Sequence, residues 1–156
     1  MKADQLMTRT VGTCSSDDSL ERAANLMWEH DLGCLVVIDA EERPVGMITD
    51  RDVAMAAYTQ GVRLCDTSVA TAMAREVISC GAEASAADVE SLMQSAQIRR
   101  VPVVGSDGKL VGIVALGDLA RAAHSSPLHM PAIPGVAKTL ATVTARRQPA
   151  PAAAAE

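Results

Sequence analysis

A threonine and an aspartate three positions apart could bind a nucleotide. Thr49 and Asp52 follow the apolar run 45–48, where a strand should give way to a helix. Free N–H groups at a helix N-terminus attract anions, so a phosphate could bind beside Thr49. The Asp52 carboxylate could accept hydrogen bonds from both hydroxyls of a ribose. The same spacing also suits a helix-capping pair that binds nothing else, and the sequence leaves both interpretations open.

These residues belong to a unit that occurs twice. The segment 45–52 returns 66 positions later as 111–118, and the same offset takes Met7 to Met73 and Cys14 to Cys80. Periods longer than ~50 residues are unusual for solenoids, so two copies indicate a duplicated small module. We therefore expect repeats at residues 1–62 and 63–124, followed by a tail, and a functional site between the repeats.

The order of elements in each copy follows from hydrophobic periodicity and turn residues. Asp18 and Glu21 have the spacing of a capping box before the first helix, and Gly61 is a plausible helix stop. Copy one should contain strand 11–14, helix 19–30, strands 35–38 and 45–48 and helix 50–60; copy two should contain strand 77–80, helix 85–97, strands 101–104 and 110–114 and helix 117–124. Residues 3–7 and 69–73 are expected to form lead-in helical turns. Proline and alanine dominate residues 125–156, which we expect to be mostly disordered apart from a brief helix at 136–143.

Composition restricts the class of partner. The chain has 156 residues, a net charge of -5, no Phe, and only Trp28 and Tyr58 as aromatic residues. Nucleic-acid binding is disfavoured, because it uses clustered positive charge and aromatic stacking. No apolar run approaches the ~20 residues of a membrane span and no signal peptide is evident, so we expect a cytoplasmic protein.

The four cysteines lack the spacing of a metal or redox motif. Cys14, Cys34, Cys65 and Cys80 are far apart in the chain, without a C-x-x-C pair. We interpret them as small buried hydrophobes. Redox sensing, or a metal site assembled across the module, is the alternative.

The duplicated segment Gly46-Met47-Ile48-Thr49-Asp50-Arg51-Asp52 carries a family resemblance. Together with Leu6-Met7-Thr8 and Arg99-Arg100-Val101-Pro102-Val103-Val104, it resembles the cystathionine-β-synthase (CBS) domain pair, or Bateman module, over about residues 1–124. The resemblance implies an α/β fold of two tandem β-α-β-β-α repeats, packed through their sheets with pseudo-twofold symmetry. It also implies a regulatory protein, not an enzyme, that senses an adenosine-containing molecule. No catalytic motif is present in the sequence.

The resemblance also implies a set of binding residues. Ribose and phosphate would contact Thr49, Asp52 and the intervening Arg51, while the adenine would lie against Val11, Cys14, Cys34, Leu35 and Val36. Arg99 and Arg100 would point into the central cleft, and arginine suits bidentate phosphate contact. The alternative for this pair is a solvated position, or a salt bridge to Glu29 or Asp31.

The second copy departs from the motif. Asp118 is kept, but Ala115 replaces the hydroxyl residue and Gly117 stands in place of Arg51. We therefore expect one competent site around Thr49 and a degenerate one formed by Asp118, Ala115, Cys80 and Pro102.

The expected ligand is AMP or ATP, with ADP, S-adenosylmethionine or NADH as further candidates, and no catalytic cofactor or metal. A homodimer is also expected from the resemblance, covering apolar helix residues such as Val53, Met55, Ala56 and Leu119, with an unidentified effector protein as partner. The competing hypothesis is an interaction or stress-response module that binds no nucleotide.

Overall fold

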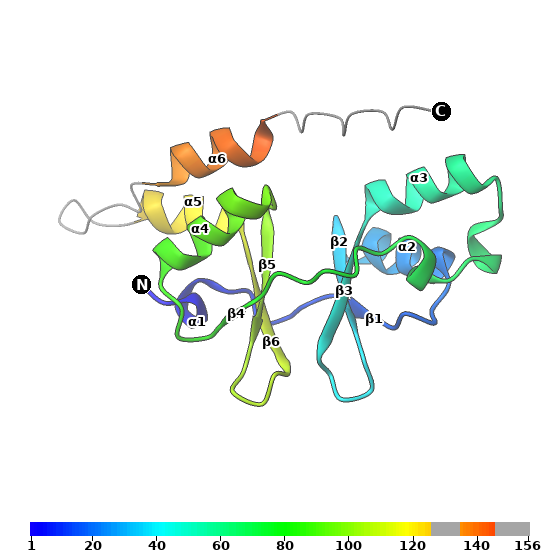
Figure 1. The fold of residues 1–156 in the computed structure, drawn as a ribbon, viewed down its shortest axis with the longest axis horizontal. Coiled ribbons are helices and arrows are strands. Elements are labelled where there is room, and N and C mark those ends of the chain that lie inside the picture. The colour runs from blue at the N-terminus through cyan, green and yellow to red at the C-terminus, as the bar shows by residue number, and fades with distance from the viewer. Residues whose placement is uncertain (126–134, 146–156) are drawn as a thin grey trace, which may run out of the picture.

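The computed structural model describes residues 1–125 and 135–145, and contains two similar α/β lobes side by side (Figure 1). The first lobe contains β1 (Thr13–Cys14), α2 (Leu20–Glu29), β2 (Cys34–Ile38), β3 (Pro44–Thr49) and α3 (Asp50–Gln60). The second contains β4 (Cys80–Gly81), α4 (Ala86–Ala96), β5 (Arg100–Val104), β6 (Leu110–Ala115) and α5 (Leu116–Ser125). The remaining elements are α1 (Ala3–Leu6), the 3₁₀ turns η1 (Leu64–Asp66) and η2 (Val69–Thr71), and α6 (Val136–Thr144). The β-α-β-β-α order expected for each repeat is confirmed.

Each lobe is built on a three-stranded sheet. β1 pairs in parallel with β2, which pairs antiparallel with β3, and β4, β5 and β6 repeat this arrangement. Large aliphatic side chains such as Leu20, Leu35 and Ile48 in the first lobe, and Met93 and Val101 in the second, are fully buried. The cores are therefore aliphatic, as the near-absence of aromatic residues predicts.

Two local expectations need correction. The first strands are shorter than predicted, because only Thr13–Cys14 and Cys80–Gly81 pair as strands with their neighbours. The cap of α2 is Ser19, whose side chain accepts a hydrogen bond from the Arg22 backbone N–H at 3.1 Å. Asp18 forms an ion pair with the Arg22 side chain at 3.2 Å, so the predicted capping box with Glu21 is wrong.

The lead-in segments cross between the lobes. Thr8 exchanges backbone hydrogen bonds with Ile113 of β6, at 2.9 and 3.0 Å. The equivalent Ala74 exchanges hydrogen bonds with Met47 of β3, at 2.9 and 3.0 Å. Each copy's lead-in segment therefore completes the sheet of the other copy, and the units in space differ from the units in sequence.

The glycine of the duplicated motif makes room for this exchange. A Cβ atom on Gly46 would lie 2.7 Å from the Met73 sulfur and 3.1 Å from the Ala74 carbonyl oxygen. Gly112 is packed in the same way against Met7. Gly46 thus has a packing role, separate from any contact with a ligand.

Helix α6 is the helix expected at 136–143, and it packs on the second lobe. It lies over α4 and α5 (Figure 1) and buries Thr139 and Val143. The brief helix expected within the tail is therefore present, and the disorder expected for the rest of the tail falls on residues 126–134 and 146–156, which lie outside the described residues. No helix in the described ranges is long and apolar enough to cross a bilayer.

The apolar surface differs from the expected one. Val53, Ala56 and Leu119 are buried inside the lobes, because they form the inner faces of α3 and α5. Met55 is exposed as expected, and Trp28 on α2 and Tyr58 on α3 are 87% and 82% exposed. The first lobe therefore presents the chain's two aromatic side chains to solvent.

Candidate functional site

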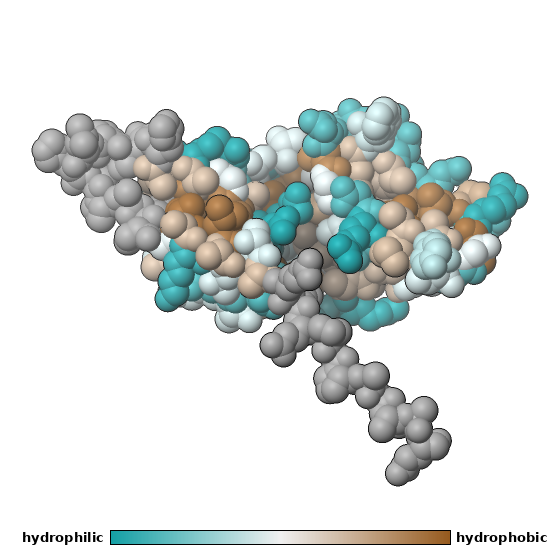
Figure 2. Space-filling model, turned by 90° about the horizontal axis from the view of Figure 1, so that it is seen from above, coloured by the Kyte–Doolittle hydropathy of each residue, from teal (hydrophilic) through white to brown (hydrophobic). Residues whose placement is uncertain are grey.

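A cleft of about 900 Å³ lies between the two lobes. Figure 2 shows hydrophilic side chains on both sides of the middle of this face. The cleft is lined by side chains of both lobes and of two further segments. They are Cys34, Met47, Thr49, Arg51 and Asp52 from the first lobe; Gln97, Ile98, Arg99, Arg100 and Pro102 from the second lobe; Ala74, Glu76 and Ile78 from the segment between η2 and β4; and Val143, Thr144 and the following Ala145 at the end of α6. The structure therefore brings together the motif of one copy and the arginine pair of the other.

Thr49 and Asp52 form a complete capping box at the start of α3. The Thr49 hydroxyl and backbone N–H donate to Asp52 Oδ2 at 2.7 and 2.9 Å, and the Asp52 N–H donates back to the hydroxyl at 3.2 Å. This is the capping interpretation of the motif, yet it uses only one carboxylate oxygen. Asp52 Oδ1 has no partner within the described part of the chain, so it can still accept hydrogen bonds from a ligand.

The N-terminus of α3 is less suited to a phosphate than the sequence suggests. The backbone N–H groups of Asp50 and Arg51 donate to the Gly33 carbonyl oxygen at 3.4 Å and to Asp50 Oδ1 at 2.7 Å, while that of Asp52 donates to Thr49. Because these first-turn donors already have partners, an anion would have to rely on the arginine side chains.

The equivalent aspartate of the second copy is already paired. The Ala115 N–H donates to Asp118 Oδ2 at 2.7 Å, and Asp118 Oδ1 forms an ion pair with Arg121. The position equivalent to Arg121 in the first copy is Met55, which carries no charge. Neither Asp118 nor Ala115 lines the cleft. The asymmetry between the copies therefore extends beyond the lost hydroxyl.

Arg99 and Arg100 both line the cleft. Neither arginine forms an ion pair with a described residue, so the alternative salt bridge to Glu29 or Asp31 is not formed. Arg100 reaches the first lobe, where a Cβ on Gly33 would lie 3.1 Å from its Nη2. The absence of a side chain at Gly33 therefore allows a cation from the second copy to lie against the first.

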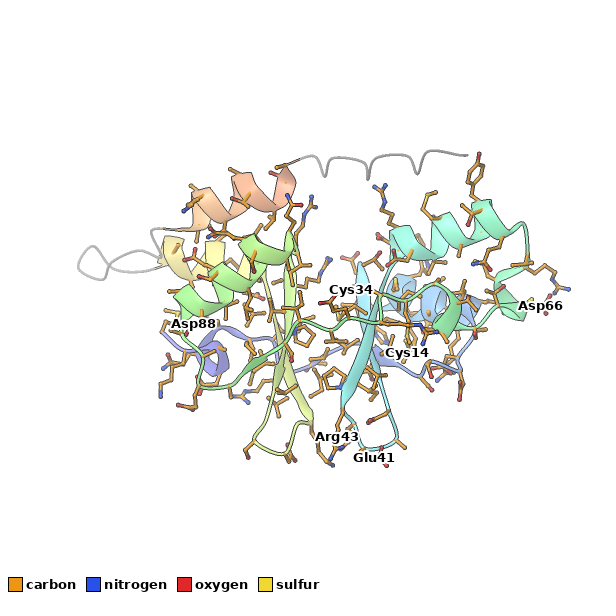
Figure 3. All side chains as sticks on the ribbon, viewed as in Figure 1. Cys14, Cys34, Glu41, Arg43, Asp66 and Asp88 are labelled. Carbon is orange, nitrogen blue, oxygen red and sulfur yellow. The ribbon has the colours of Figure 1, made fainter. Side chains whose placement is uncertain are left out.

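The cysteines are free and mostly buried. Burial raises the pKa of the Cys14 thiol to about 11 and also raises the pKa of Cys80. At the cleft, burial raises the pKa of Cys34, and the opposing influence of Arg100 does not reverse it. Figure 3 places Cys34 between the lobes and Cys14 inside the first lobe. These thiols therefore stay protonated at neutral pH.

Several predicted binding residues lie away from the cleft. Leu35 and Val36 are 1% and 0% exposed, because both faces of β2 are covered, and Cys14 is also buried. Val11 is half-buried outside the cleft lining. In the second copy, Cys80 is a core residue, whereas Pro102 lines the same cleft as Thr49, not a separate one.

The position of residues 74–78 and of the end of α6 at the cleft was not predicted from the sequence. Ala74 is placed by its pairing with Met47, and Glu76 and Ile78 follow it along the cleft. The lead-in pairing could not be read from spacing, since both partners look alike in the two copies. A brief helix at 136–143 is expected from the sequence, but nothing in the sequence indicates that its end lies at the cleft.

Two α/β repeats that share a central cleft and exchange their lead-in segments define a CBS-domain pair. The CBS domain family model matches residues 3–58 and 68–125, and the chain belongs to this family. It is 42% identical over 114 residues to the CBS domain-containing protein YhcV of Bacillus subtilis, covering 73% of this chain and 79% of that protein. It is 38% identical over 122 residues to hypoxic response protein 1 of Mycobacterium tuberculosis, covering 76% and 82%.

Solved CBS-pair structures have the same fold. Hypoxic Response Protein I, crystallised with two coordinated zinc ions, superposes with a TM-score of 0.72 at 30% identity, covering 84% of this chain and 100% of that one. CBSX2 in complex with AMP gives 0.69 at 26% identity, covering 79% and 96%. A CBS pair in complex with 5′-methylthioadenosine and S-adenosyl-L-methionine gives 0.70 at 26% identity, covering 78% and 94%. In the described part of this chain, no group of three or more His, Cys, Asp or Glu side chains could hold a metal ion.

Proposed function

We propose that this chain is a regulatory module that binds an adenosine nucleotide in the cleft between its repeats and signals its occupancy to a partner protein. The observation that carries the proposal is the composition of the cleft. Asp52 offers an unpaired carboxylate oxygen, and Arg51, Arg99 and Arg100 form no ion pair with any described residue. An acceptor for ribose hydroxyls and donors for phosphate therefore face one space. The AMP complex of CBSX2 supports this class of ligand.

The binding mode follows from which groups are already used. Asp52 Oδ1 would accept from the ribose while Oδ2 keeps the cap of α3. The phosphates would contact Arg99 and Arg100, because the first N–H groups of α3 are occupied. The base would lie against apolar lining residues such as Met47 and Ile78. A single ligand would then contact both copies, so its binding would favour one position of the two lobes relative to each other.

A ligand screen tests the proposal. Melting temperatures would be recorded with AMP, ADP, ATP, NADH and S-adenosylmethionine, since a ligand at 100 times its Kd adds roughly 2.7 kcal/mol of stability. We expect stabilisation by at least one adenine nucleotide, which Arg100→Gln should weaken. If every ligand leaves the melting temperature unchanged, the nucleotide proposal fails.

Self-association is the second part of the proposal. Trp28, Met55 and Tyr58 lie exposed on α2 and α3, two helices that pack against each other. An apolar face of this kind favours a homodimer through the first lobe. Light scattering of the wild type and of Trp28→Glu/Tyr58→Glu would test it. A variant that keeps the wild-type mass would exclude this face as the interface.

A ligand-independent interaction module is the competing function. One observation favours it: Thr49 and Asp52 already hydrogen-bond to each other as a capping box, without a ligand. In that case no nucleotide would change stability, and capture of a partner would not depend on nucleotide. Melting temperatures with and without nucleotide therefore separate the two functions.

A further inference from the structure

The last turn of α6 forms one wall of the cleft. Val143, Thr144 and Ala145 line it together with Arg99 and Arg100. In Figure 1, α6 lies over α4 and α5 with its C-terminal end directed towards the space between the lobes. The first lobe has no such helix in the described part of the chain. Helix α6 therefore makes the cleft asymmetric.

Polar contacts hold α6 on α4. The Gln94 side-chain amide donates to Thr139 Oγ1 at 2.8 Å, and the Thr139 hydroxyl lies 3.4 Å from Glu90 Oε1. The Gln97 side chain donates to the Thr142 carbonyl oxygen at 3.4 Å. Thr139 is fully buried by these contacts. The positions equivalent to Glu90, Gln94 and Gln97 in the first copy are Ala24, Trp28 and Asp31, so these contacts are specific to the second lobe.

The C-terminal end of α6 carries the wrong sign of charge for a neighbouring phosphate. Carbonyl groups at a helix C-terminus carry a partial negative charge. This charge attracts arginine side chains and repels anions. This end of α6 and the Arg99–Arg100 pair face the same cleft. A phosphate bound to the arginines would therefore compete with the end of α6. Gln97, two residues before Arg99, contacts both the cleft and α6 and would transmit the change.

We propose that α6 is an autoinhibitory element of the cleft, whose docking on the second lobe opposes binding of a phosphate-bearing nucleotide. The inference rests on the proposed function. Because coupling between two binding events is reciprocal, nucleotide loosens α6 by the factor by which undocking α6 tightens nucleotide. The interaction of one charge with a helix end predicts a change in Kd of about two- to fivefold.

The test undocks α6 with substitutions at residues that do not themselves line the cleft. Thr139→Asp places a second carboxylate against the buried Glu90, and Ala137→Asp places the same charge on the exposed side of α6. Gly135→Val is an uncharged alternative, since a Cβ there would lie 2.5 Å from Glu90 Oε2. The Kd of ADP would be measured by calorimetry, and docking by amide hydrogen exchange over residues 139–143.

We expect faster exchange in Thr139→Asp and Gly135→Val, with ADP bound about two- to fivefold more tightly, and wild-type behaviour in Ala137→Asp. In the wild type, ADP should accelerate exchange in α6. Unchanged or weaker ADP binding in variants whose α6 exchanges faster would overturn autoinhibition while leaving the proposed function intact. Slower α6 exchange on adding ADP to the wild type would do the same. If ADP binds neither the wild type nor the undocked variants, autoinhibition fails, whereas the proposed function fails only if none of the ligands in the screen changes the melting temperature.

Discussion

Replacing Asp52 by Asn should separate ligand binding from helix capping. Asp52 uses Oδ2 for the cap, and no described residue pairs with its Oδ1 at the cleft. Hydrogen bonds to a charged group contribute about 1.5–3 kcal/mol each. Losing one such charge-assisted bond to a ribose hydroxyl should therefore weaken nucleotide binding by roughly 10- to 150-fold. Calorimetric titration with the nucleotide found in the ligand screen would measure this loss.

The chain contains a matched control for the cap. Ser85 and Asp88 form the same box at the start of α4, with bonds of 2.7, 2.9 and 3.2 Å. Asp88 is exposed and lies outside the cleft lining, on the side of the second lobe away from Cys34 (Figure 3). Asp88→Asn should lose similar cap energy, on the order of 1 kcal/mol, but keep full nucleotide affinity.

A third variant tests the second copy. Asp118→Asn should not change affinity, because Arg121 already occupies Asp118 Oδ1 and the residue does not line the cleft. Undiminished binding by Asp52→Asn, or equal losses in Asp52→Asn and Asp88→Asn, would refute the assignment of Asp52 as the ribose acceptor.

Three further predictions concern the frame around the site. Gly46→Ala should lower the free energy of unfolding by about 1–3 kcal/mol in urea denaturation, because its Cβ would meet Met73. Gly81→Ala should leave the free energy of unfolding unchanged, because its Cβ meets open space. Equal effects of the two substitutions would contradict the packing argument. Removing residues 1–8 should speed amide exchange in β6 more than in β3, because Thr8 pairs with Ile113; equal protection would argue against the exchange of segments. Burial against α6 raises the pKa of Glu90, so the docked state binds the Glu90 proton more tightly than the undocked state. Docking should accordingly be favoured below the ordinary pKa of glutamate and weaken as the pH rises through the raised pKa, and hydrogen exchange in Glu90→Gln should lose this pH dependence.

Local elements of this fold could be predicted because each copy repeats its own hydrophobic pattern. The helix–strand junction at Thr49 and the cap residue Ser85 both follow from short-range spacing. The pairing of Thr8 with Ile113 could not, because it joins residues far apart in sequence and leaves no periodic signal. The cap of α2 was misplaced by one residue for a different reason: Asp18, Ser19 and Glu21 offer overlapping capping patterns, and only the tertiary structure selects Ser19.

The sequence predicted which charged residues lie at the cleft, but not which apolar residues do. Asp52, Arg99 and Arg100 carry charged groups that are costly to bury unpaired. They are therefore expected at a solvent-accessible cleft and not in the core. Leu35 and Val36 are apolar in either location, and the sequence cannot distinguish a core strand from a base-binding wall. The paired state of Asp118 was hidden because Arg121 stands one helical turn away in a segment that looks like an ordinary exposed helix face.

The crossing of the lead-in segments bears on how such a chain can arise and be divided. In a polypeptide with a single repeat, the lead-in segment and the strand edge that accepts such a segment would both lack the partners that the other copy supplies here. Both could then pair as in this structure only with another molecule. The segment between α3 and η2 joins the two copies and places each at an effective concentration in the millimolar range for the other. The pairing of lead-in segments then no longer depends on protein concentration. Cutting the chain in this connection should therefore yield two fragments that fold fully only when mixed.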